Sequence, residues 1–107
     1  MTHRRDTVEI KKSALSYNNG DPVVEDHVVL ITDKCFIERY EGQNERKSVD
    51  GSTVFFSIVV HLDSVKDLPK KGDKIIATKA DGTMNKLELE VKDSWNYPNI
   101  GKAKIWA

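Results

Sequence analysis

The sequence has one cysteine, no excess charge of either sign and no long apolar run. Its 107 residues include 17 basic and 17 acidic side chains, which gives a formal net charge of zero. A neutral chain has no bulk attraction to phosphate backbones or anionic lipids, so any contact with nucleic acid must be local. The lone Cys35 excludes an internal disulfide and is typical of a reducing compartment. No apolar segment follows residues 1–6, so we expect neither an ordinary export signal nor a membrane span.

Motifs for catalysis and cofactor binding are also lacking. The glycines are scattered singly at turns and form no phosphate-binding loop, and no serine lies in a Gly-x-Ser-x-Gly elbow. A chain this short leaves little room for a deep pocket. The residues that could bind a metal lack the close paired spacing of zinc ligands; they are His27, Cys35, His61 and Asp63. We therefore predict a protein that is not an enzyme and has no cofactor or metal, with Cys35 buried as a small apolar residue.

Alternation of charged and apolar side chains predicts β-strands. In residues 86–91 the apolar positions are Leu87, Leu89 and Val91, as in a strand with one face on a core. This strand follows residues 74–78 across an Asp-Gly turn, which predicts a hairpin. Further strands are expected at residues 7–11, 23–31, 35–40, 54–62 and 102–106. The segments 23–31 and 35–40 fit either two strands or one bent strand.

These segments predict an all-β protein with a single domain, residues 1–107, built as a small barrel or sandwich of six or seven strands. The central strand is expected at 54–62, because this stretch is almost continuously apolar and so suits a strand covered on both faces. A dense turn signal at residues 18–22 predicts a chain reversal. Residues 63–67 have room for one helical turn before Pro69.

Two segments are candidates for contact with partners. Residues 41–51 carry one apolar side chain and are predicted to form a long polar loop. This loop is either a flexible hairpin connection or a segment that becomes ordered or moves when a ligand or another subunit meets it. Its candidate residues are Glu41, Gln43, Asn44, Glu45, Arg46, Lys47 and Asp50. Large rings gather near the end of the sequence, in an expected loop at 93–101 and the last strand, where they serve either as a lid on the barrel or as partner contacts; they are Trp95, Tyr97 and Trp106.

A nucleic-acid-binding barrel of the oligonucleotide-binding type is the alternative. Such a barrel exposes aromatic rings among basic residues, because bases stack on rings while a basic groove follows the phosphates. Phe55 and Phe56 are adjacent in a strand and cannot both point outward. The pairs suited to stacking are Tyr40 beside Arg39 and Trp106 beside Lys104. A third interpretation is a small accessory subunit of another assembly.

The order of strands and turns resembles that of the head-completion proteins of tailed phages and prophages, the small head-tail connector or stopper family. The resemblance covers most of the chain and lies in its turn chemistry. It comprises Gly-Asp-Pro-Val after the first strand (20–23), a short strand before the polar loop (35–40), an Asp-Gly turn into a long apolar strand (50–62), Leu-Pro-Lys-Lys-Gly-Asp-Lys-Ile (68–75), and Trp-Asn-Tyr-Pro-Asn-Ile-Gly (95–101).

The resemblance implies a structural protein of the virion neck, present in the host bacterial cytoplasm during assembly. Such a subunit docks as a ring below the portal or its adaptor, meets the tail-completion protein, and helps to retain packaged DNA, which passes only transiently. Isolated subunits of this kind can be monomeric until they meet their platform. By position, residues 41–51 would be the loop that gates the lumen, and their mixed charges suit a channel that must not grip DNA.

Overall fold

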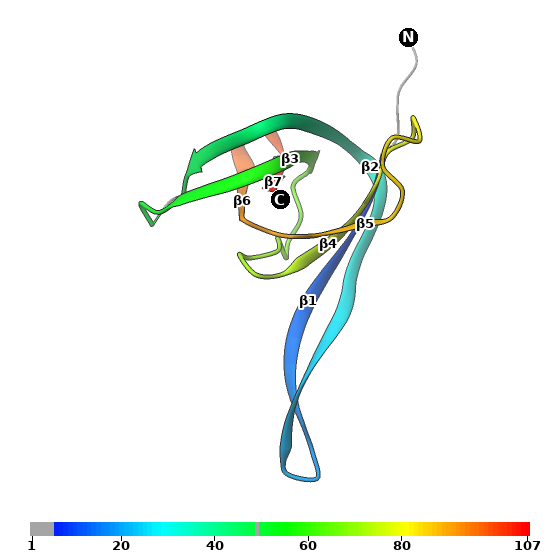
Figure 1. Cartoon of the computed structure of the whole chain (residues 1–107), viewed down its shortest axis with the longest axis vertical. Coiled ribbons are helices and arrows are strands. Elements are labelled where there is room, and N and C mark those ends of the chain that lie inside the picture. Colours follow the sequence, from blue (N-terminus) through cyan, green and yellow to red (C-terminus); the bar gives the residue numbers. More distant parts are fainter. Residues whose placement is uncertain (1–5, 49) are drawn as a thin grey trace.

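The computed structural model describes residues 6–48 and 50–107, with the side chains of Ala14, Asp26 and Gln43 left aside. Over these residues the chain forms one antiparallel sheet of seven strands, in the order β5-β4-β1-β2-β3-β7-β6 (Figure 1). The strands are β1 (Asp6–Asn18), β2 (Asp21–Lys47), β3 (Thr53–Asp63), β4 (Lys74–Thr78), β5 (Leu87–Glu90), β6 (Asp93–Tyr97) and β7 (Lys102–Trp106), and a short 3₁₀ helix, η1, spans Pro98–Ile100. The predicted all-β class is confirmed.

The sheet curls into a barrel because its two end strands are consecutive in the sequence. Only Val91 and Lys92 separate β5 from β6, while β5 pairs with β4 and β6 pairs with β7. The amide of Lys92 donates to the carbonyl of Trp106 at 2.8 Å, which continues the pairing through this connection. One bent segment therefore spans both edges of the sheet and removes most of the exposed edge that an open sheet would present.

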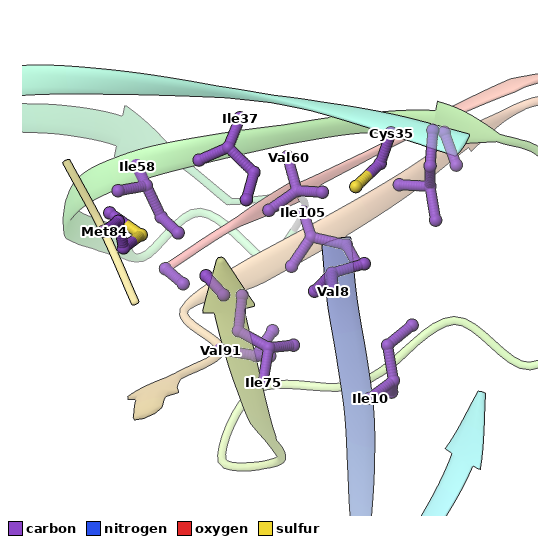
Figure 2. Packing of buried hydrophobic residues seen from close by; sticks show 14 residues of the cluster. Val8, Ile10, Cys35, Ile37, Ile58, Val60, Ile75, Met84, Val91 and Ile105 are labelled. Carbon is purple, nitrogen blue, oxygen red and sulfur yellow. The ribbon is translucent and has the colours of Figure 1, made fainter. Parts of the chain in front are cut away.

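The interior of the barrel is filled by branched aliphatic side chains from most of its strands. Figure 2 shows them converging between the ribbons. Val8, Ile10, Ile37, Val60, Ile75, Val91 and Ile105 have no exposed surface. Several strands contribute alternate residues, as the pleat requires, so the predicted alternation at residues 7–11 and 102–106 corresponds to real inward and outward faces. Cys35 belongs to this cluster, as predicted.

A buried carboxylate fastens the start of β1 to two other segments. Asp6 has no exposed surface, and its two oxygens accept hydrogen bonds of 2.8 Å from the amides of Ile37 and Ala80. The ammonium of Lys79 lies 3.8 Å from the same carboxylate and donates to the carbonyl of Ile37. The thiol of Cys35 donates to the carbonyl of Asp6 at 3.0 Å. These contacts join β1, β2 and the β4–β5 connection at one end of the barrel.

β2 is one continuous strand of 27 residues, which settles the choice between two strands and one bent strand. Its first half pairs with β1 beyond the barrel, and the two strands project as a ribbon at the bottom of Figure 1. We call residues 12–34 the arm. Its tip is a two-residue turn in which Asn19 and Gly20 have φ values of 53° and 85°. Asn-Gly favours this left-handed geometry, so the predicted reversal at 18–22 is confirmed.

The predicted loop at residues 41–51 is instead mostly strand. β2 continues to Lys47, and its last residues pair with the start of β3, from Asn44 opposite Phe56 to Lys47 opposite Thr53. The pairing is irregular between Arg39 and Asn44, and a tight turn follows in which Gly51 donates to the carbonyl of Ser48. Val49 lies outside the described residues. This distal hairpin, residues 41–56, is polar because most of its side chains face solvent, and polarity alone does not distinguish such a ribbon from a loop.

Four smaller expectations need correction. Residues 63–67 complete β3 and continue without a helical turn, and the helix found in the described residues is η1 instead. The aromatic segment predicted as a loop at 93–101 contains β6, which pairs with β7. Leu87 is 43% exposed although Val91 is fully buried, because β5 reaches the core only at its end. β3 is covered on both faces only at Ile58, Val59 and Val60.

Candidate functional site

A cleft of about 690 Å³ lies on the β2-β3-β7 side of the barrel, bordered by η1. Cross-strand register places its outward side chains in rows. Phe36 lies opposite His61, and His61 opposite Lys104, while Asp63 lies opposite Lys102. Residues directly opposite each other in a sheet share a face, so these side chains stand together. The full lining is Asp33, Lys34, Cys35, Phe36, His61, Leu62, Asp63, Tyr97, Ile100, Lys102, Ala103 and Lys104.

The cleft combines rings with charges of both signs. The rings of Phe36 and His61 have centroids 6.0 Å apart, and the ammonium of Lys104 lies 5.8 Å from the ring centre of Tyr97. Lys102 donates to Asp63 at 2.8 Å. This hydrogen bond, together with the lysine charge, lowers the pKa of Asp63. The cleft is thus an amphipathic surface whose charges are partly neutralised by internal pairs.

Beside the cleft, His61 forms a hydrogen bond to Glu38, which also accepts one from the hydroxyl of Tyr40 at 3.1 Å. Desolvation raises the pKa of Glu38, but these two hydrogen bonds outweigh it, and the net pKa is lowered. The same contact with Glu38 raises the pKa of Tyr40. Glu38 thus holds the imidazole of His61 and the hydroxyl of Tyr40 in place from one carboxylate.

The arm carries the second candidate surface. Leu15 lies opposite Val24 and Tyr17 opposite Pro22, so these side chains share one face of the ribbon. Leu15 is 59% exposed, Tyr17 70% and Val24 68%. Farther along β2 the apolar surface continues through three more exposed residues, Val28, Val29 and Ile31. The arm thus presents apolar side chains to solvent along much of its length.

Most of the predicted loop residues lie on the distal hairpin and point to solvent. Glu41, Glu45 and Lys47 are exposed, and Asn44 is half-buried with its amide bonded to the carbonyl of Glu41 at 3.2 Å. Asp50 accepts hydrogen bonds from the amide and hydroxyl of Ser52, which lower its pKa. The side chain of Gln43 is outside what the structure describes. The structure therefore gathers these residues on one projection, as a hairpin instead of a loop.

Arg46 differs from its neighbours on the hairpin. Its guanidinium lies 3.6 Å from the ring centre of Trp106, and its Nε donates to Asp93 at 2.7 Å. The ring of Trp106 is only 6% exposed. Trp106 is therefore buried in the wall of the barrel and unavailable to a partner, so the prediction of a partner contact at this residue is wrong. Arg46 joins β2 to β6 and β7 through its contacts with Asp93 and Trp106.

The other predicted aromatic contacts are accessible. Trp95 is 43% exposed, opposite Lys104 on β6 and β7, and Tyr97 borders the cleft. Of the expected stacking pairs, Trp106 packs under Arg46 rather than Lys104, and Tyr40 packs edge-on against Phe56 at 5.6 Å. Phe55 is exposed and Phe56 half-buried, so the two rings do lie on opposite faces, as predicted.

The candidate metal ligands do not form a centre. Within the described residues no group of three or more histidine, cysteine, aspartate or glutamate side chains is arranged to hold a metal ion. His27 lies on the arm, whereas Cys35, His61 and Asp63 border the cleft. Burial raises the pKa of the Cys35 thiol to about 12, with Asp6 and Asp33 adding to the shift. That thiol is therefore protonated at neutral pH and a poor ligand or nucleophile.

The sequence predictions missed the cleft and the exposed face of the arm. Phe36 lies between the inward residues Cys35 and Ile37, so the period of two already assigns it to the outer face. For Ile100, which is 68% exposed, no local pattern marks the position, because a short 3₁₀ turn has no second face to compare.

Comparisons with known proteins give no match to a family model, to a curated protein or to a solved structure. In residues 6–48 and 50–107, no helix has the length and hydrophobicity needed to cross a bilayer.

Proposed function

We propose that this chain is a structural subunit of the neck of a tailed phage or prophage, a head-completion or stopper protein that docks as a ring below the portal. Its partners are the portal or adaptor above it and the tail-completion protein below it. It works in the virion neck and is made in the bacterial cytoplasm. DNA passes through the ring without being bound tightly, and no chemical step is needed.

The observation that carries the proposal is the division of the chain between a filled barrel and two projecting hairpins. The barrel interior is occupied by aliphatic side chains with no exposed surface, including Ile10, Ile37 and Ile105. What remains for function is outward: the apolar face of the arm, the distal hairpin and the cleft. A ring subunit needs such a combination of a rigid body and surfaces that meet neighbours.

The distal hairpin is the segment we assign to the lumen. Its exposed charges are mainly acidic, with Glu41, Glu45 and Asp50 opposed by Lys47. Such a surface gives no net attraction to phosphates, which suits a passage for DNA. Arg46 is excluded from this role, because its guanidinium is engaged by Trp106 and Asp93.

The test is deletion of the coding sequence from the phage or prophage genome that carries it. After induction, electron microscopy should show heads that lack tails and lose their DNA, and infectious particles should disappear. A plasmid copy of the wild-type chain should restore both. A copy with Ile58→Asp, which places a charge in the core, should not restore them. Normal tailed particles in the absence of the chain would refute the proposal.

A second candidate function is binding of single-stranded nucleic acid in the cleft. It is favoured by one observation, the presence of Phe36 and Tyr97 beside Lys34 and Lys104. Rings stack on bases while lysines contact phosphates. Fluorescence anisotropy with a labelled oligonucleotide at low salt tests it: affinity should weaken steeply with added salt and with Phe36→Ala. Unchanged anisotropy up to high protein concentration would remove this candidate.

A further inference from the structure

The arm is a ribbon that the rest of the chain leaves unsupported. The pairing of β1 with β4 runs from Thr7 to Lys11 and ends there, and the pairing of β2 with β3 begins at Cys35. Beyond these points, within the described residues, the outer edges of both arm strands pair with no other strand. An isolated two-stranded ribbon is at best marginally stable in water. An element with free edges and an apolar face is suited to a contact that covers it.

The cleft offers a surface of matching chemistry. Its volume of about 690 Å³ is enough for several side chains, and its apolar border includes Phe36, Tyr97 and Ile100. The arm presents Leu15, Tyr17 and Val24 on one face. Both surfaces are apolar with charges at their margins, which is the usual composition of a protein contact with a polar rim.

The arm cannot fill the cleft of its own chain. Asp33 and Lys34, at the root of the arm, line the cleft, and the ribbon leads away from the barrel from there (Figure 1). At about 3.3 Å per residue, the tip at Gly20 lies on the order of 40 Å from this root. Only the arm of another molecule can bring Leu15 and Tyr17 to the cleft.

Charge favours a second copy of this chain over a nucleic acid as the occupant. The cleft is lined by three lysines and two aspartates, and Lys102 is already paired with Asp63 at 2.8 Å, so little positive charge is left for a polyanion. The face of the arm that Leu15, Tyr17, Pro22 and Val24 form near the tip is uncharged, so it can cover the apolar border of the cleft without setting a charge against Lys34 or Lys104. The formal net charge of zero means that copies do not repel one another.

We propose that the arm of one copy docks by its apolar face into the cleft of the next copy. The two surfaces are different parts of the chain, so the contact is heterologous and propagates from copy to copy. Such a contact closes into a ring when the rotation between copies permits it. The inference deepens the proposed neck function and relies on it only for ring closure.

Covalent trapping of the contact tests the proposal. Asn18→Cys places a thiol at the tip of the arm, and Asn99→Cys places one beside Ile100 at the border of the cleft; both residues are exposed. A short bismaleimide added to the concentrated double variant should give a ladder of dimers, trimers and higher multimers. The native Cys35 is buried and should not react, because its pKa is raised to about 12.

Matched variants make the result specific. The control pair Asn18→Cys with Lys47→Cys, which moves the second thiol to the distal hairpin, should give at least about tenfold less multimer. Leu15→Asp should abolish the ladder because it would bury an unpaired charge. His27→Asp lies on the opposite face of the ribbon, opposite Lys12, and should leave the ladder unchanged.

The outcomes separate this inference from the proposed function. No ladder above the control pair, at the highest concentration at which the chain is soluble, would overturn the docking proposal, even if the chain is found in phage particles. A ladder from a chain that is dispensable for particle assembly would support docking and refute the neck function. Binding of an oligonucleotide in the cleft without a ladder would also overturn docking.

Discussion

Removal of the buried carboxylate of Asp6 should destabilise the barrel more than any other single polar substitution. Its oxygens accept hydrogen bonds from the amides of Ile37 and Ala80, and the ammonium of Lys79 lies 3.8 Å away. Asp6 has no exposed surface and Lys79 is only 8% exposed. In Asp6→Ala, two amides lose their acceptors and a buried ammonium loses its counterion.

The magnitude follows from the cost of breaking a buried ion pair on one side, which is about 3–5 kcal/mol. A domain of this size has a total stability of about 5–15 kcal/mol, so the variant should be close to unfolding. Urea denaturation followed by circular dichroism should show a large drop in the midpoint. Asp6→Asn keeps one acceptor oxygen and should lose less, about 1–3 kcal/mol.

A double-mutant cycle isolates the ion pair from the amide contacts. Lys79→Met removes the ammonium, so Asp6→Ala should cost at least about 1 kcal/mol less in that background than in the wild type. If Asp6→Ala costs less than about 1 kcal/mol in the wild-type chain, the carboxylate does not fasten the barrel end and the reasoning is refuted.

Three further predictions concern the contact between Arg46 and Trp106, the core residue Ile58 and the thiol of Cys35. Arg46→Ala should lower the free energy of unfolding by about 1–3 kcal/mol, measured by urea denaturation, because it removes both the cation–π contact with Trp106 and a partly buried ion pair. Ile58→Ala should cost about 2–5 kcal/mol in the same assay, whereas Phe55→Ala, at an exposed position, should cost less than about 1 kcal/mol. The pKa of Cys35 is raised from 9.0 to about 12, so its contribution to stability is fully present below pH 9 and is lost as the pH rises toward 12; thermal melts of Cys35→Val should lack this part of the alkaline decline.

Each of these has an outcome that would contradict it. If Arg46→Lys and Arg46→Ala lowered the free energy of unfolding equally, the planar guanidinium and its contacts would not be the source of the stabilisation. Similar costs for Ile58→Ala and Phe55→Ala would mean that β3 does not present alternate faces to the core. An unchanged alkaline decline in Cys35→Val would show that other groups account for it.

Local patterns were enough to predict the strands that line the core. Val8, Ile37, Val60 and Ile105 are alternate apolar residues in segments identified as strands from the sequence. The reversal at Asn19-Gly20 was also predictable, because few residues other than asparagine and glycine adopt its left-handed conformation. Where a strand has one buried face and one solvent face, the period of two carries the information directly.

The projecting hairpins were harder to predict, for a physical reason. In residues 41–47 most side chains are in solvent, so no alternation separates a ribbon from a loop, and only the pairing of Asn44 with Phe56 reveals the strand. The arm has the opposite ambiguity. Val24 and Ile31 look like core residues in the sequence, yet both are exposed, because pattern records hydrophobicity and not whether another element covers the face.

The candidate surfaces depend on contacts between segments distant in the sequence. The cleft requires the register that sets Phe36 beside His61 and His61 beside Lys104, and that register has no signature in any single segment. The burial of Trp106 under Arg46 joins the end of β2 to the last strand of the chain. The Asp6 contacts likewise span 31 and 74 positions. Such features follow from topology, which the local sequence leaves open.

Electron cryo-microscopy of particles induced from the genome that carries this chain tests the central claim most directly. The account predicts a ring of copies of this barrel between portal and tail, with each distal hairpin directed toward the channel. Complete, DNA-filled particles whose neck contains no density for this barrel would contradict it.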